Sequence, residues 1–171
     1  MNGVSIFWMQ ILTSVFVMSV VTAWYVWPRL TGRPRNSVLI LLLFVHVPRY
    51  VGMTVLVPGM VDPNLPREFL SNTAYGDLLE AGLAFLSIYA LRKNWSVAIS
   101  MVWVTNTWGL VDLLNGLRGV LQLNVPGFNL ATLWYIYTFY APLVLISHLL
   151  IFVFLFKSGR YDTSDSRAQD T

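Results

Sequence analysis

The stretch that decides the fold is Val4–Trp27, which reads VSIFWMQILTSVFVMSVVTAWYVW and contains no Asp, Glu, Lys or Arg. A helix needs about 20 apolar residues to cross the hydrocarbon core of a bilayer. The stretch is too long for the apolar part of a secretion signal, and no basic residue precedes it. We therefore expect it to be a retained membrane-spanning helix.

Four more stretches have the same character, so the predicted spans are Val4–Trp27, Ser37–Val57, Ala74–Leu91, Trp95–Leu117 and Thr132–Phe156. The chain is 56% hydrophobic and only 11% charged, whereas soluble domains carry about 25% charged residues. It has too few polar side chains to cover a water-facing surface. We predict an all-α, polytopic bundle of about five transmembrane helices, with a helical domain over residues 1–157 and a disordered cytosolic tail over 158–171.

The basic residues between the spans alternate from one side of the membrane to the other. One side holds Arg67 and Arg118, and the other holds Arg29, Arg33, Arg35, Arg92, Lys93, Lys157, Arg160 and Arg167. Lys and Arg are retained on the cytosolic side, so the N-terminus is expected outside and the C-terminus in the cytosol. This placement explains the basic pI without nucleic acid. The expected partners are the lipid bilayer and either a second copy or a membrane partner subunit.

Several charged residues lie inside the predicted spans, at depths in the outer half of the bundle. A charged group at mid-membrane costs about 2.5–3.5 kcal/mol on insertion scales. Such groups must therefore meet one another, water or a ligand. The predicted ligand- or proton-binding residues are Arg49, Tyr50, Asp77, Glu80, Asp112 and Asn115, with His46, Asn106 and His148 as a secondary set.

The charges inside the spans do not balance. One arginine, Arg49, faces the three carboxyl groups of Asp77, Glu80 and Asp112, which gives a net charge of −2 if all are ionised. We expect that one or two of these acids carry a proton at pH 7, or that a cation lies among them. Small residues on the same helix faces, such as Gly109, favour close helix packing.

Two prolines and one loop add to this interpretation. Pro48 and Pro142 lie inside spans and leave the carbonyls of Phe44 and Thr138 without their helical donors, so side chains, water or a ligand should satisfy them. The outer segment Pro58–Thr73 is expected to be an interfacial connector or a lid over the charged cluster.

Three segments carry a resemblance. They are His46-Val-Pro-Arg49-Tyr50-Val-Gly52, Tyr75-Gly-Asp77 with Glu80, and Asn106-Thr-Trp-Gly109-Leu-Val-Asp112-Leu. They resemble segments of small uncharacterised multi-pass proteins of the bacterial inner membrane. The resemblance implies a bacterial inner-membrane location and no particular activity.

The sequence contains no cysteine and none of the common nucleotide-binding or hydrolase motifs, so binding is favoured over catalysis. The first hypothesis is a binding or transport module for protons, a cation or a small polar ligand. A second is a redox protein that holds b-type haem between His46 and His148. A third is a structural or accessory subunit, and a membrane enzyme acting on lipid or isoprenoid substrates is a further alternative. A metal site from His46, Glu80 and Asp112 fits by residue type, and the metal is not specified.

Overall fold

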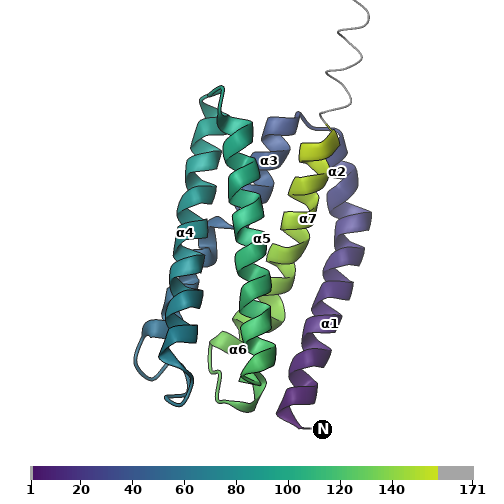
Figure 1. Ribbon diagram of the computed structural model, residues 1–171. Helices are drawn as coiled ribbons and strands as arrows, with labels where there is room; N and C mark the ends of the chain where they lie inside the picture. Colours follow the sequence, from purple (N-terminus) through teal and green to yellow (C-terminus); the bar gives the residue numbers. More distant parts are fainter. Residues whose placement is uncertain (1, 158–171) are drawn as a thin grey trace, which may run out of the picture.

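A computed structural model describes residues 2–157 and shows them as five helical rods that run side by side (Figure 1). Rod one comprises α1 (Gly3–Val21), the π-helical turn η1 (Thr22–Val26) and α2 (Trp27–Thr31). Rod two comprises α3 (Arg35–Leu43) and the 3₁₀ segment η2 (Val47–Leu56). Rods three and four are α4 (Arg67–Arg92) and α5 (Ala98–Gln122). A short 3₁₀ turn, η3 (Val125–Gly127), leads to rod five, which comprises α6 (Leu133–Tyr135), the π-helical turn η4 (Ile136–Tyr140) and α7 (Ala141–Lys157). The all-α prediction is confirmed, and the tail predicted as disordered lies outside the described residues.

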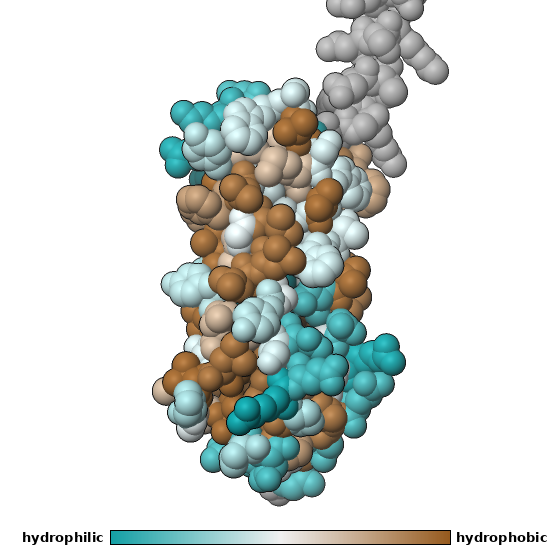
Figure 2. Space-filling view, turned by 60° about the vertical axis from the view of Figure 1, so that its left-hand side comes forward, coloured by the Kyte–Doolittle hydropathy of each residue, from teal (hydrophilic) through white to brown (hydrophobic). Residues whose placement is uncertain are grey.

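Rods one, two, three and five are each long and apolar enough to cross a membrane. Rod four is of similar length but lies outside that set, because α5 carries Asn106, Asp112, Asn115 and Arg118. On the face that Figure 2 shows, apolar side chains cover much of the middle of the bundle, and hydrophilic side chains gather at both ends, most extensively at the end where the chain begins.

The third helix begins earlier than predicted, at Arg67 rather than Ala74. Its first two turns are therefore the segment that was expected to belong to a surface connector or lid. Pro66 occupies the N-cap position, and Glu68 lies in the first turn, where its negative charge is stabilised by the positive end of the helix dipole. Leu70 is buried in the core and holds these turns against the bundle.

The core consists of two apolar clusters with a polar layer between them. One cluster includes Leu39, Ala84, Val102 and Ile151, and the other includes Phe7, Val55, Leu70, Val120 and Leu133. Along rods two to five, most of the buried polar residues fall between these clusters in sequence, among them His46, Arg49, Glu80, Asn106, Ser147 and His148. The apolar clusters drive packing, and the polar layer concentrates the chemistry near the middle of the bundle.

A hydrogen-bonded clasp at the end of the bundle joins the loop before α4 to the loop before α6. The backbone N–H of Asp62 donates to the Asn129 carbonyl over 3.0 Å, and the Asn129 N–H donates back to Asp62 Oδ2 over 3.3 Å. The N–H of Asn64 also donates to this carboxylate. The amides of Asn64 and Asn129 hold the pKa of the Asp62 carboxyl below its usual value.

We expect Asp62→Asn to loosen this clasp. A carboxyl group whose pKa is lowered by folding contributes stability above its unfolded pKa, and that contribution is lost as the pH falls through the folded value. The clasp should therefore be intact at neutral pH and weaken only in acid below the usual aspartate range. Hydrogen–deuterium exchange at pH 7 should show faster exchange in the loops around Asn64 and Asn129 in the variant, with α7 unchanged. Equal exchange in both proteins would contradict the role of the carboxylate.

Candidate functional site

The site begins with a break in rod two. The α-helix ends at Leu43, a turn covers residues 44–46, and the chain continues as a 3₁₀ helix that has Pro48 in its first turn. Pro48 has no N–H to donate, and the change of helix type leaves carbonyls available. Rod five satisfies two of the nearby ones, because Ser147 Oγ donates to the Leu42 carbonyl over 3.0 Å and Tyr140 Oη donates to that of Val45 over 2.7 Å. The Phe44 carbonyl, which Pro48 was expected to free, is not one of these two, so its satisfaction stays a prediction.

The 3₁₀ geometry decides which side chains enter the bundle. It has three residues per turn, so residues at i and i+3 lie on one face. His46, Arg49, Gly52 and Val55 are accordingly all buried. Tyr50 was predicted as a binding residue together with Arg49, on the assumption of an α-helix whose inward face would include both. In the 3₁₀ segment Tyr50 lies off the buried face and is 56% exposed.

Arg49 lies at the centre of a three-helix ion cluster. Its Nε and Nη2 both lie 2.7 Å from Asp77 Oδ1 on α4, and Nη2 also lies 2.6 Å from Asp112 Oδ2 on α5. The third nitrogen, Nη1, donates to the Gly109 carbonyl over 3.2 Å. The Arg49 side chain is 4% exposed, and the side chains of Asp77 and Asp112 are 15% and 20% exposed. The predicted meeting of these three residues is therefore observed.

Each of the three acids lies against a glycine of a neighbouring rod. A Cβ atom built on Gly52 would collide with the Asp77 carboxylate, one on Gly76 with that of Asp112, and one on Gly109 with that of Glu80. Only a residue without a side chain lets the rods approach this closely. Gly109 was expected to be a packing residue. Gly52 and Gly76 were not, because their role depends on how rods two, three and four are aligned.

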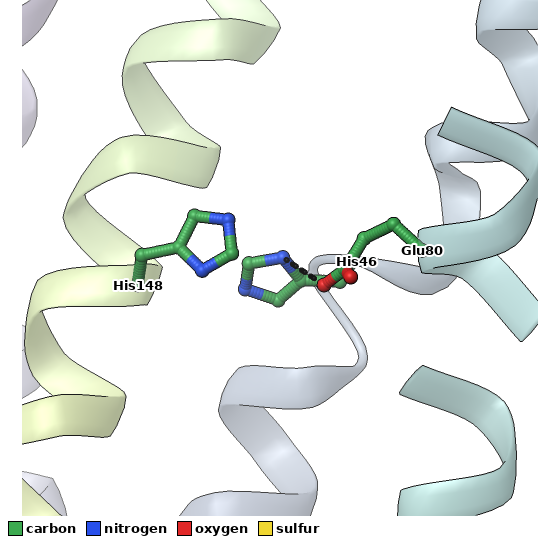
Figure 3. A group of neighbouring side chains, drawn as sticks. All are labelled: His46, Glu80 and His148. Carbon is green, nitrogen blue, oxygen red and sulfur yellow. Dashed lines mark ion pairs between the residues drawn. The ribbon is translucent and has the colours of Figure 1, made fainter. Parts of the chain in front are cut away.

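Glu80 belongs to a second, deeper cluster. The residues at its centre are His46, Glu80 and His148, all of which are 0% exposed, and Figure 3 shows the His46 ring between the Glu80 carboxylate and the His148 ring. His46 Nδ1 lies 3.6 Å from Glu80 Oε1. Asn106 and Ser147 hold the outer ring nitrogens, with His148 Nδ1 to Asn106 Oδ1 at 2.8 Å and His46 Nε2 to Ser147 Oγ at 3.1 Å. The secondary set of predicted residues thus forms one contiguous group.

The two imidazoles are too close to hold a haem between them. Their ring centroids lie 4.2 Å apart and the ring planes are inclined by 56°. A porphyrin must lie between its two axial histidines, and rings in contact leave no space for it. This arrangement therefore does not support the haem alternative. The metal-binding residues suggested by the sequence were His46, Glu80 and Asp112. In the structure His148, rather than Asp112, lies with His46 and Glu80.

A cavity of about 450 Å³ adjoins the Arg49 cluster and extends toward the end of the bundle where the chain begins. All five rods contribute to its wall. Its polar lining includes Arg49, Asp77, Asp112, Asn115 and Tyr137, and its apolar lining includes Phe7, Ile11, Val55, Leu114 and Val144. The predicted residue Asn115 lines this cavity from an exposed position. The contributions of rods one and five were not foreseen, because their apolar residues look like ordinary lipid-facing or core positions in the sequence.

These features define the class of protein: an all-helical bundle with one ion cluster around Arg49, one histidine–glutamate cluster, and a mainly apolar cavity beside the ion cluster. The chain belongs to the family described as "Domain of unknown function (DUF8737)", whose model matches residues 6–156. That match spans both clusters and the cavity, and it agrees with the resemblance to uncharacterised proteins. No curated protein and no solved structure matches the chain.

Proposed function

We propose that the protein is a five-span integral membrane protein of the bacterial inner membrane, with its N-terminus outside. Four apolar rods support this, and α5 packs against α4 and α7 with Asn106 buried and Asp112 paired with Arg49. The turn after α2, the turn after α4 and the end of α7 lie at one end of the bundle (Figure 1). That end carries Arg29, Arg33, Arg35, Arg92, Lys93 and Lys157, as a cytosolic face should. Lys157 Nζ lies 4.4 Å from the centre of the Trp27 ring, a contact suited to the membrane interface.

Within this framework the cavity in the outer half binds a small ligand that has an apolar body and a cationic end. The observation that carries the proposal is the position of the Arg49–Asp77–Asp112 cluster in the wall of an otherwise mainly apolar cavity. One arginine and two ionised aspartates leave a net charge of −1. A ligand cation would neutralise that charge, and the apolar wall would bury the ligand body. Both aspartates line the cavity and have partly exposed side chains.

A matched set of rigid probes tests this proposal. We expect 1-aminoadamantane to bind the protein in lipid nanodiscs at least tenfold more tightly than 1-adamantanol or 1-adamantanecarboxylate, because only the amine complements the aspartates. Asp112→Asn should reduce the preference for the amine about tenfold. Native mass spectrometry and the shift in thermal unfolding, followed by tryptophan fluorescence, would measure both effects.

Asp62→Asn is the control, since Asp62 is an aspartate outside the cavity. Equal binding of the three probes, or an unchanged preference in Asp112→Asn, would refute the proposed site. Two results together would instead support the structural or accessory role: the wild-type protein binds none of the three probes, and the Asp112→Asn variant no longer assembles.

A further inference from the structure

We propose that His46, Glu80 and His148 form a buried binding site for one divalent transition-metal ion, with Zn²⁺ as the representative. The site is distinct from the cavity, because none of the three residues lines it. The inference does not rest on the proposed function.

The three side chains bring the right donors to one place. One nitrogen from each imidazole and one carboxylate oxygen lie within 4.8 Å of one another. They come from three different rods, and Figure 3 shows them converging in the interior. Two histidines and one carboxylate are a common ligand set for Zn²⁺ and for Fe²⁺.

The donor atoms facing this point lack other partners. Among the described residues, His46 Nδ1, both Glu80 carboxylate oxygens and His148 Nε2 are buried and make no hydrogen bond. Buried polar atoms are almost always satisfied. Four such atoms on three adjacent side chains indicate that a ligand common to all of them belongs there.

The surrounding hydrogen bonds also set the tautomers that a metal requires. Ser147 Oγ donates its proton to the Leu42 carbonyl, so it accepts from His46 Nε2–H and leaves a lone pair on Nδ1. Asn106 Nδ2 donates to the His148 carbonyl, which turns its Oδ1 toward His148 Nδ1–H and leaves a lone pair on Nε2. Metal-binding histidines have this arrangement, in which the second ring nitrogen donates to a fixed acceptor.

A divalent cation also resolves the charge imbalance of the polar layer. Arg49 contributes +1, and Asp77, Asp112 and Glu80 contribute −3 when ionised. One divalent ion cancels this sum of −2, which is the total for the layer when the cavity holds no cationic ligand. The Gly109 backbone connects the two groups, because its carbonyl accepts from Arg49 and its Cα lies against the Glu80 carboxylate.

The site must contract slightly when it binds. Tetrahedral ligand atoms at about 2.0–2.1 Å from Zn²⁺ are about 3.4 Å apart. The 3.6 Å between His46 Nδ1 and Glu80 Oε1 is already close to that separation. All pairs lie within 4.8 Å, so no pair needs to close by more than about 1.4 Å. Three protein ligands leave a fourth position for water.

Metal analysis of the purified protein tests the inference. The protein should be expressed with a histidine-free affinity tag, extracted in mild detergent, stripped with EDTA and titrated with Zn²⁺ or Co²⁺. We expect one metal ion per chain by plasma mass spectrometry. Bound Co²⁺ should show the visible absorption bands of a site with nitrogen and oxygen ligands, and excess Zn²⁺ should abolish them.

Glu80→Gln and His148→Gln should weaken Zn²⁺ binding at least tenfold. Ser147→Ala should do the same, because it removes the acceptor that fixes the His46 tautomer. Glu68→Gln is the matched control, since it makes the same substitution at an exposed position on the same helix. Wild-type protein that is folded yet binds neither ion would overturn the proposal even if the variants do not fold. So would an infrared band of a protonated carboxylic acid that persists with saturating Zn²⁺ and disappears in Glu80→Gln, because Glu80 would then hold a proton in place of the metal.

Discussion

Arg49→Met should lower the free energy of unfolding by about 3–5 kcal/mol, the effect expected when one partner of a buried ion cluster is removed. Methionine fills much of the same volume, so the loss would come mainly from charge. Asp77 and Asp112 would be left as neighbouring carboxylates without a cation. The Gly109 carbonyl would also lose its donor. Reversible unfolding in mixed micelles, followed by circular dichroism, would measure the change.

Two comparisons separate charge from packing in this experiment. Arg118→Met changes an exposed arginine on α5 and should shift stability by no more than about 0.5 kcal/mol. Adding Asp77→Asn and Asp112→Asn to Arg49→Met should restore a large part of the loss, since no unpaired charge would remain. If the triple variant is less stable than the single one, the cluster acts through its shape rather than its charge.

The second large effect is expected from Gly109→Ala. The added methyl group would collide with the Glu80 carboxylate, which is buried and has no exposed route of escape. Overpacking of this kind costs about 1–3 kcal/mol, and it should also displace Glu80 from the two histidines. Gly76→Ala should behave in the same way, through the Asp112 carboxylate.

Gly82→Ala provides the control on the same helix as Gly76. No atom lies within 4 Å of the position its methyl group would take, and alanine favours a helix by about 0.5–1 kcal/mol over glycine. It should therefore leave unfolding unchanged or make it slightly less favourable. Equal losses in Gly82→Ala and Gly109→Ala, measured by the same unfolding titration, would show that the tight contact at Glu80 is unimportant.

Features that depend on hydropathy and on buried charge could be predicted from the sequence, whereas the type and exact ends of the helices could not. The apolar stretches predicted the helices closely, and the intramembrane charges predicted that Arg49 meets Asp77 and Asp112, because ions in an apolar bundle have few other places to go. Tyr50 was misplaced because the sequence does not reveal that Pro48 begins a 3₁₀ segment, in which the buried face recurs every three residues. The first turns of α4 were missed because Arg67 and Glu68 look like loop residues when hydropathy alone is read.

The amino-acid sequence by itself determined the elements and the residues that must be buried together, since hydropathy and the cost of burying charge act on each residue locally. Only the tertiary structure decided the partners. Three features depend on the rotation and axial alignment of rods far apart in the chain. They are the contacts of three carboxylates with Gly52, Gly76 and Gly109, the contact between His46 and His148, and the cavity beside Arg49. Those quantities are set by the fit of whole helix surfaces, which no local pattern encodes.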